Sequence, residues 1–197
     1  MDQTIQSRAA KIKLLLMDCD GVLTDGHLWV LEHDGDQKAF AARDGLGIEL
    51  LHRGGIKSGV ISGRLSGAVE RRARGLGMSY LKLGFEDKVG VFKEIIAEAA
   101  VSESEVAYIG DDLNDIPLLR LAGLAVAVAD ATEETRAHAH YVTNAKGGNG
   151  AVRGHLRRRI RRPVQAATAI LRSGAGRVSG WPSPTGWTAA SVAVRPA

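Results

Sequence analysis

The chain has 197 residues, 45% of them hydrophobic and 24% charged, which is ordinary for one globular domain with its own core. Its single cysteine, Cys19, excludes an internal disulfide framework, and the apolar stretch Leu14–Met17 is too short for a signal peptide or membrane span, so we expect a cytoplasmic protein. The net charge of +4 divides unevenly: residues 1–150 carry 17 Lys and Arg against all 22 acids, whereas residues 151–197 carry nine Arg and no acid. This division excludes a nucleic-acid-binding surface that spans the whole domain.

Strand and helix patterns alternate over the first 145 residues. Short apolar runs bounded by Gly or Asp predict strands, and amphipathic segments between them predict helices. In chain order we predict strand 12–17, strand 57–61, helix 69–76, strand 79–83, helix 89–99, strand 106–109, helix 113–122, strand 124–128 and strand 141–143. The alternation indicates an α/β fold with a doubly wound, parallel, Rossmann-like sheet, in which ligands bind beyond the C-terminal ends of the strands.

One segment interrupts this alternation. "GHLWVLEHDGDQKAF" (26–40) predicts a projecting β-hairpin with Asp34-Gly35 as its turn. Residues 28–31 are all apolar, so both faces of this predicted strand are apolar. A hairpin that projects from a small domain should not expose such a run to water. We therefore expect the hairpin to be buried against another subunit. Packing of the hairpin on the chain's own core is the alternative.

Two acidic clusters each follow a predicted strand. Asp18 and Asp20 follow the first strand, and Asp111, Asp112 and Asp115 follow the strand at 106–109. Two such clusters at neighbouring strand ends would repel each other unless a cation lay between them, and Mg²⁺ suits a site made only of oxygen ligands. Either cluster alone could instead be a helix cap with solvated loop acids.

Two further polar residues fall at the same predicted end of the sheet. Ser62 ends a strand in "VISGR" (60–64), and Lys88 begins a helix in "FEDKV" (85–89). Taken singly, they would be a turn residue and a solvated surface charge. Carboxylates, a divalent cation, a hydroxyl and an ammonium at one end of a sheet are what phosphoryl transfer needs, since its catalysis is mainly positioning and charge neutralisation.

These motifs resemble those of the haloacid dehalogenase superfamily of phosphatases in order and spacing: "DCDGVLT" (18–24), Ser62, Lys88 and "GDDLND" (110–115). The resemblance implies that Asp18 is the nucleophile that forms an aspartyl-phosphate, and that Asp20 is the general acid and then the general base. It also implies that Asp18, the backbone carbonyl of Asp20 and Asp111 hold Mg²⁺.

The same resemblance assigns the remaining residues of the clusters. Ser62 and Lys88 would bind the phosphoryl oxygens, and Asp112 and Asp115 would orient Lys88 and the waters on the metal. A receiver-like phosphoacceptor domain also has acids, a hydroxyl residue and a lysine on a doubly wound sheet. Asp20 favours the phosphatase, because an acid two residues after the nucleophile promotes hydrolysis of the phospho-aspartate.

Spacing leaves no room for the cap domain that most members of the superfamily insert over the site. Only 43 residues separate Asp18 from Ser62, and 25 separate Ser62 from Lys88. The first gap already holds the hairpin and a helix. We therefore expect a capless haloacid dehalogenase-type fold, which must admit large substrates or borrow its lid from a neighbouring subunit.

The finer pattern resembles one capless branch, the 3-deoxy-D-manno-octulosonate 8-phosphate (KDO 8-phosphate) phosphatases. The matching stretches are "DGVLTDG" (20–26), "KAFAARDGLGI" (38–48), "SGR" (62–64), "VAYIGDDLND" (106–115), "AVADA" (127–131) and "YVTNAKGGNGAVR" (141–153), together with Arg72. The resemblance implies hydrolysis of a phosphorylated sugar acid in lipopolysaccharide precursor synthesis, a homotetramer, and Mg²⁺ as the cofactor.

It also implies a set of substrate-binding residues, several of which are cationic and suit an acid substrate. The set is Asp20, Ala41, Ala42, Arg43, Asp44, Gly45, Arg64, Arg72 and Lys88. Arg72 could instead be a solvated helix residue, and Arg43 could pair with Asp44. A sialic-acid-type 9-phosphate is the close alternative substrate, and Arg72 favours the eight-carbon acid.

The resemblance ends after Arg153, so we predict a phosphatase domain at 1–153 and an atypical basic tail at 154–197. The tail could be a nucleic-acid or membrane arm, a disordered segment, or the product of a shifted reading frame. We favour the frame shift, because residue usage changes abruptly near position 154. No membrane partner is expected, and no nucleic-acid partner is expected unless the basic tail is genuine.

Overall fold

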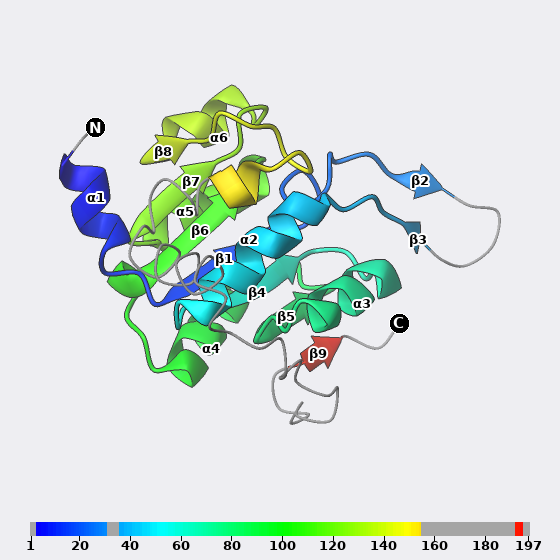
Figure 1. Ribbon diagram of the computed structural model, residues 1–197, viewed down its shortest axis with the longest axis horizontal. Coiled ribbons are helices and arrows are strands. Elements are labelled where there is room, and N and C mark those ends of the chain that lie inside the picture. The colour runs from blue at the N-terminus through cyan, green and yellow to red at the C-terminus, as the bar shows by residue number, and fades with distance from the viewer. Residues whose placement is uncertain (1–2, 31–35, 155–191, 195–197) are drawn as a thin grey trace, which may run out of the picture.

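The computed structural model describes residues 3–30, 36–154 and 192–194, in which helices flank a central parallel sheet (Figure 1). The strands of this sheet are β8, β7, β6, β1, β4, β5 and β9, in that spatial order. Their bounds in chain order are β1 (Leu14–Met17), β4 (Lys57–Ser62), β5 (Tyr80–Leu83), β6 (Val106–Gly110), β7 (Leu124–Ala127), β8 (Tyr141–Val142) and β9 (Val192–Val194). The predicted doubly wound α/β fold is confirmed.

The strand order places β1 at the point where the winding direction reverses. From β1 the chain proceeds to β4 and β5 on one side, and then returns to β6, β7 and β8 on the other. The last residue of β1, Met17, lies opposite Val60 of β4 and Ile109 of β6. The segments that follow β1, β4 and β6 therefore leave the sheet at one edge, where open α/β sheets bind their ligands.

Helices cover both faces of the sheet, and side chains of β1 alternate between two cores. Leu15 and Met17 pack with buried residues of α2 (Ala42–Arg53) and α3 (Gly67–Gly75), whereas Leu14 and Leu16 pack with buried residues of α4 (Lys88–Ala99) and α5 (Ile116–Leu121). Figure 1 shows α2 lying across the sheet in front of β1 and β4. The remaining helices are α1 (Gln3–Ala9), α6 (Glu133–Ala137) and the 3₁₀ turns η1 (Glu103–Glu105) and η2 (Leu113–Asp115).

The predicted hairpin is present as the short antiparallel pair β2 (Trp29–Val30) and β3 (Asp36–Gln37), which projects from one side of the molecule (Figure 1). Leu28 and Trp29 are 48% and 64% exposed, so for these two residues the alternative of packing on the chain's own core is wrong. The predicted turn at Asp34-Gly35 lies outside the described residues.

The structure corrects several element bounds. Strand β1 begins two residues later than predicted, and the predicted helix 113–122 is divided into η2 and α5, with Pro117 near the start of α5. Helices α1 and α6 and strand β9 are absent from the prediction. Within the predicted tail the structure describes only Gly154 and 192–194, so the interpretations of the tail stay predictions. No helix in the described part of the chain is long and apolar enough to cross a membrane.

Candidate active site

Asp18, the first residue after β1, lies at the centre of a buried polar cluster. Its side chain is 9% exposed, and its Oδ1 lies 3.1 Å from Nζ of Lys88, the first residue of α4. Lys88 is itself 4% exposed. Burial lowers the pKa of Lys88, but the carboxylates of Asp115 and Asp18 outweigh burial and raise it above its ordinary value. Lys88 therefore stays cationic beside Asp18.

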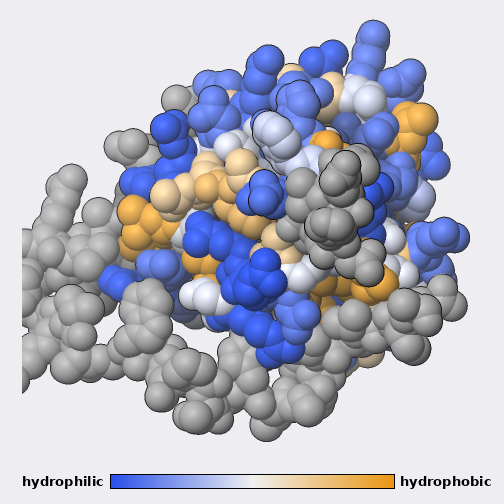
Figure 2. All heavy atoms as spheres, turned by 90° about the vertical axis from the view of Figure 1, so that its right-hand side faces the viewer, coloured by the Kyte–Doolittle hydropathy of each residue, from blue (hydrophilic) through white to orange (hydrophobic). Residues whose placement is uncertain are grey.

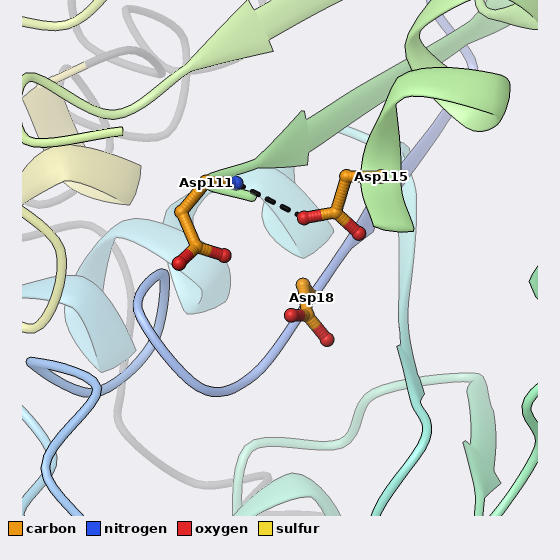
Figure 3. Close-up of side chains that lie close together, drawn as sticks. All are labelled: Asp18, Asp111 and Asp115. Carbon is orange, nitrogen blue, oxygen red and sulfur yellow. Dashed lines mark hydrogen bonds between the residues drawn. The ribbon is translucent and has the colours of Figure 1, made fainter. Parts of the chain in front are cut away.

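Asp115 is fully buried, and protein donors occupy both of its carboxylate oxygens. Its Oδ1 accepts hydrogen bonds from Lys88 Nζ (2.8 Å) and Tyr108 Oη (2.8 Å), and its Oδ2 accepts one from the backbone N–H of Asp111 (3.0 Å). Figure 3 shows this last bond and the carboxyl group of Asp115 turned toward Asp18. Asp115 thus links α4, β6 and η2, and it fixes the position of the Lys88 ammonium.

Asp111, the residue after β6, lies against the backbone of the loop that follows Asp18. A Cβ at Gly21 would overlap Oδ2 of Asp111, and Gly21 has a φ of 85°, which favours glycine. Asp111 Oδ1 is buried and has no hydrogen-bond partner among the described residues. A buried carboxylate oxygen without a partner is costly, and a cation would satisfy it.

The carboxylates themselves form a site for a cation. Asp18, Asp111 and Asp115 each offer an oxygen, and these atoms lie within 4.8 Å of one another in the described part of the chain (Figure 3). Burial and the charge of Asp115 raise the pKa of Asp18 to about 7, and burial with the charges of Asp115 and Asp18 raises the pKa of Asp111 to about 8. A divalent cation would oppose both shifts because it favours the ionised carboxylates, and an all-oxygen set suits Mg²⁺.

Asp20 lies beside this cluster and contacts two cations. Lys38, whose side chain is 3% exposed, donates a hydrogen bond to Oδ1 of Asp20. Arg64 Nε lies 3.9 Å from Oδ2, with its side chain 61% exposed. These contacts hold the Asp20 carboxyl between the hairpin side of the molecule and the turn after β4.

Ser62 and Asp112 are placed differently from each other. Ser62 ends β4 at the same edge as Asp18, is 3% exposed, and its Oγ accepts a hydrogen bond from the backbone N–H of Arg64 (3.2 Å). Asp112 is exposed, and its carboxylate caps η2 by accepting from the N–H of Leu113 (2.7 Å). The described contacts of Asp112 therefore do not include Lys88, although its charge helps to raise the pKa of Asp111.

The residues of "AARDG" (41–45), which were predicted to bind the substrate, lie at the start of α2. Ala41 is the N-cap, and Ala42 and Arg43 are exposed. Asp44 is 1% exposed and accepts two backbone hydrogen bonds from the segment around 150–153, so its carboxylate is already occupied. Gly45 is buried against Arg72, whose Nη2 a Cβ at position 45 would overlap.

Arg72 of α3 is held in a defined place rather than free in solvent. Its guanidinium lies 5.9 Å from the centroid of the Phe40 ring and against the backbone at Gly45. It is therefore ordered at the side of the domain where the hairpin joins α2.

Sequence reasoning missed Lys38, Tyr108 and the loop at 147–150. Lys38 lies in a quoted stretch, but nothing in the spacing relates it to Asp20, eighteen residues earlier. Tyr108 resembles any other strand residue in an apolar run. For the loop, the three glycines within the four residues "GGNG" were the available signal.

Comparisons with known proteins show which family this chain is similar to. A family model described as haloacid dehalogenase-like hydrolase matches residues 85–153. The chain is 45% identical over 152 residues to a 3-deoxy-D-manno-octulosonate 8-phosphate phosphatase of Yersinia pestis, covering 77% of this chain and 81% of that protein.

Solved structures of similar sequence share the fold. A 3-deoxy-D-manno-octulosonate 8-phosphate phosphatase of Moraxella catarrhalis, in complex with magnesium, phosphate and KDO, is 37% identical with a TM-score of 0.82, covering 88% of this chain and 99% of that one. The cobalt-bound form of a deoxy-D-mannose-octulosonate 8-phosphate phosphatase from Haemophilus influenzae is 33% identical with a TM-score of 0.78, covering 85% of this chain and 97% of that one.

Proposed function

The chain belongs to the KDO 8-phosphate phosphatase family of haloacid dehalogenase-like hydrolases, and we propose that it hydrolyses the phosphate ester of KDO 8-phosphate to KDO and phosphate. The observation that carries this proposal is the buried cluster in which Lys88 joins Asp18 to Asp115 while Asp111 keeps an unpartnered oxygen. Such a cluster supplies a nucleophile, a fixed ammonium and a place for a divalent cation at one edge of the sheet.

Mg²⁺ fits this cluster. Asp18, Asp111 and the backbone carbonyl of Asp20 would hold the ion, whereas the oxygens of Asp115 are already taken by Lys88, Tyr108 and the backbone. When bound, the ion neutralises charge on the phosphoryl oxygens and orients the ester.

The chain's own groups divide the chemistry. The Asp18 carboxylate attacks phosphorus and forms the aspartyl-phosphate, while Lys88, together with Ser62, binds the phosphoryl oxygens. Asp20 gives a proton to the departing alcohol and later takes one from the attacking water. Lys38 and Arg64 contact the two carboxylate oxygens of Asp20 and so fix the position of that group.

A sugar acid brings a carboxylate as well as a phosphate, and three arginines of the described chain are candidates to bind that carboxylate. Arg64 contacts Asp20, Arg72 is held between Phe40 and Gly45, and Arg43 lies in the first turn of α2. Guanidinium groups bind carboxylates through paired hydrogen bonds. We assign the substrate carboxylate to these arginines, and the neighbouring positions 41, 42 and 45 to the wall of the pocket.

The hairpin supports assembly into a homotetramer. Figure 2 looks at the side from which the hairpin projects and shows hydrophobic residues exposed at several places on a largely hydrophilic surface. Leu28 and Trp29 of the hairpin are among the exposed large apolar residues of the described chain. Burial of these side chains would favour association. Light scattering should give four times the chain mass, and a monomer at micromolar concentration would refute assembly. We place the enzyme in the cytoplasm, because a chain whose single cysteine cannot form an internal disulfide suits a reducing compartment.

Phosphate release from defined esters tests the proposed function. The purified chain should release phosphate from KDO 8-phosphate with Mg²⁺, and EDTA should abolish the release. A sialic-acid-type 9-phosphate and p-nitrophenyl phosphate should be turned over with lower kcat/KM. Asp18→Asn should be inactive on all three. Preference for the nine-carbon ester would correct the substrate, and no Mg²⁺-dependent turnover of any ester would refute a phosphatase.

A further inference from the structure

The loop Gly147-Gly148-Asn149-Gly150, called here the brace loop, packs against the loop that carries the catalytic aspartates. A Cβ at Gly147 would overlap the carbonyl oxygen of Gly21, and a Cβ at Gly148 would overlap the backbone of Asp25. The N–H of Gly148 donates to the carbonyl oxygen of Val22 (3.0 Å). Two glycines therefore allow one backbone to lie directly on the other, an approach that any side chain would prevent.

The catalytic loop, defined as residues 18–25, is attached at both of its ends. At its start, the N–H of Asp18 donates to the carbonyl oxygen of Ile109 in β6 (3.0 Å). Within the loop, the N–H groups of Leu23 and Thr24 donate to the carbonyl oxygen of Cys19 (2.9 and 3.1 Å). At its far end the contact is the brace loop. The backbone at Asp20 lies between these two attachments.

Asp44 attaches the brace loop to α2. Its Oδ2 accepts a hydrogen bond from the N–H of Gly150 (2.9 Å), and its Oδ1 accepts one from the N–H of Arg153 (2.8 Å). The carboxylate is buried, and it joins segments more than a hundred residues apart in sequence. A carboxylate can accept at both oxygens, whereas an amide of the same shape can accept at only one.

Asp130, in the segment after β7, provides a second attachment of the brace loop. Its Oδ1 accepts a hydrogen bond from the N–H of Gly147 (2.9 Å). The brace loop is therefore held at Gly147 by the segment after β7 and at Gly150 by α2, with the contact to Val22 between them.

From these contacts we propose that Asp44 is a positioning residue for catalysis. Its hydrogen bonds hold the brace loop against the catalytic loop and so fix the backbone at Asp20. The inference rests on the proposed function, because the catalytic loop matters only if Asp18 and Asp20 do the chemistry. Catalytic groups must be held to a fraction of an ångström, so a small displacement of this loop lowers kcat. Asp44 itself touches no reacting group.

Asp44→Asn and Asp44→Ala test this role, with Glu49→Gln as the matched control. Glu49 lies in the same helix and loses the same charge, but it is absent from the brace contacts. The first readout is hydrogen exchange of the metal-free protein, followed over residues 19–25 and 147–150. The second is kcat and KM for p-nitrophenyl phosphate with saturating Mg²⁺, measured well below each variant's Tm.

Both readouts should change in the Asp44 variants alone. Exchange at Leu23, Thr24 and Gly148 should accelerate about tenfold in Asp44→Asn and more in Asp44→Ala, because one or both bonds are lost. The kcat should fall about 10- to 100-fold with little change in KM, because loop geometry and not ester affinity is altered. Glu49→Gln should match the parent in both.

A backbone variant makes the test independent of the stability of the Asp44 variants. Gly148→Ala pushes the brace loop off the catalytic loop and should reproduce the Asp44 signature. Its control is Gly77→Ala, which has a similar positive φ (65° against 61°) and open space at its Cβ. If Gly148→Ala and Asp44→Asn both keep parental kcat and loop exchange, the inference is overturned, whether or not Asp44→Ala folds. An inactive parent would instead refute the proposed function.

Discussion

Replacement of Asp115 by Asn discriminates between a residue that positions Lys88 and one that binds the metal directly. The change keeps the side-chain shape and removes one negative charge. The single oxygen of the amide can still accept from Lys88 and Tyr108, which already share Oδ1 in the parent. The NH₂ group then faces the N–H of Asp111, which loses its acceptor.

The expected cost follows from these contacts. A buried N–H without a partner costs about 1–3 kcal/mol, and the weaker bond to Lys88 costs about 1 kcal/mol more. The sum, about 2–4 kcal/mol, corresponds to a fall in Tm of roughly 4–16 °C for a domain of this size. Removal of the charge also relieves repulsion between Asp115 and the carboxylates of Asp18 and Asp111, which would mask part of this cost. Stability should therefore be measured at about pH 6, below the raised pKa values of about 7 and 8, where Asp18 and Asp111 are largely protonated in the metal-free protein.

Thermal unfolding of the metal-free protein is the assay, with Tyr108→Phe as a control that removes one donor and no charge. Asp115→Asn should lower Tm more than Tyr108→Phe does, because two interactions change instead of one. If Asp115 were a metal ligand held there only for the ion, the metal-free variant would be as stable as the parent or more stable. That result, with loss of the Mg²⁺-induced rise in Tm, would refute the positioning role.

Three further predictions concern the glycines and the carboxyl groups of the site. Gly21→Ala should lower kcat at least about 100-fold and weaken Mg²⁺ activation, because its Cβ displaces the Asp111 carboxylate; a Mg²⁺ titration of turnover measures both. Gly45→Ala should raise KM for KDO 8-phosphate severalfold, up to about tenfold, and leave p-nitrophenyl phosphate unaffected, because its Cβ displaces chiefly the Arg72 guanidinium; equal changes for both esters would contradict this. The raised pKa values of Asp18 and Asp111 mean that the folded, metal-free protein holds protons that the unfolded chain releases. The metal-free protein should therefore lose stability as pH rises from about 4 to about 8. Because Mg²⁺ must displace these protons at low pH, the Mg²⁺-induced rise in Tm should be larger at about pH 8 than at about pH 5.

Sequence reasoning succeeded where a pattern repeats along the chain. The strands at 57–62, 80–83, 106–110 and 124–127 are short apolar runs, because parallel strands are covered on both faces, and such runs are visible without a structure. Placement of Asp18, Ser62 and Asp111 at one edge followed from the strand order typical of doubly wound sheets. Helices α1 and α6 were missed because seven and five residues are too few for a helical period to stand out.

Contacts between distant segments could not be predicted from patterns. Asp44 was assigned to the substrate with its neighbours, yet both of its oxygens accept from backbone N–H groups more than a hundred residues away. Lys38 carries no local signal of its contact with Asp20, because that contact depends on how the hairpin returns to the sheet. Asp112 and Asp115 are three residues apart, but one is exposed and the other fully buried. These differences arise from tertiary packing, which the spacing of residue types does not encode.

The most direct test of the whole account is to locate the phosphoryl group during a single turnover. Enzyme mixed with KDO 8-phosphate and Mg²⁺ would be quenched in acid within one turnover, and its peptides would be mapped by mass spectrometry. The account predicts one phosphoryl group on Asp18, and none in Asp18→Asn. A phosphoryl group on another residue, or turnover with an unmodified chain at every time point, would contradict it.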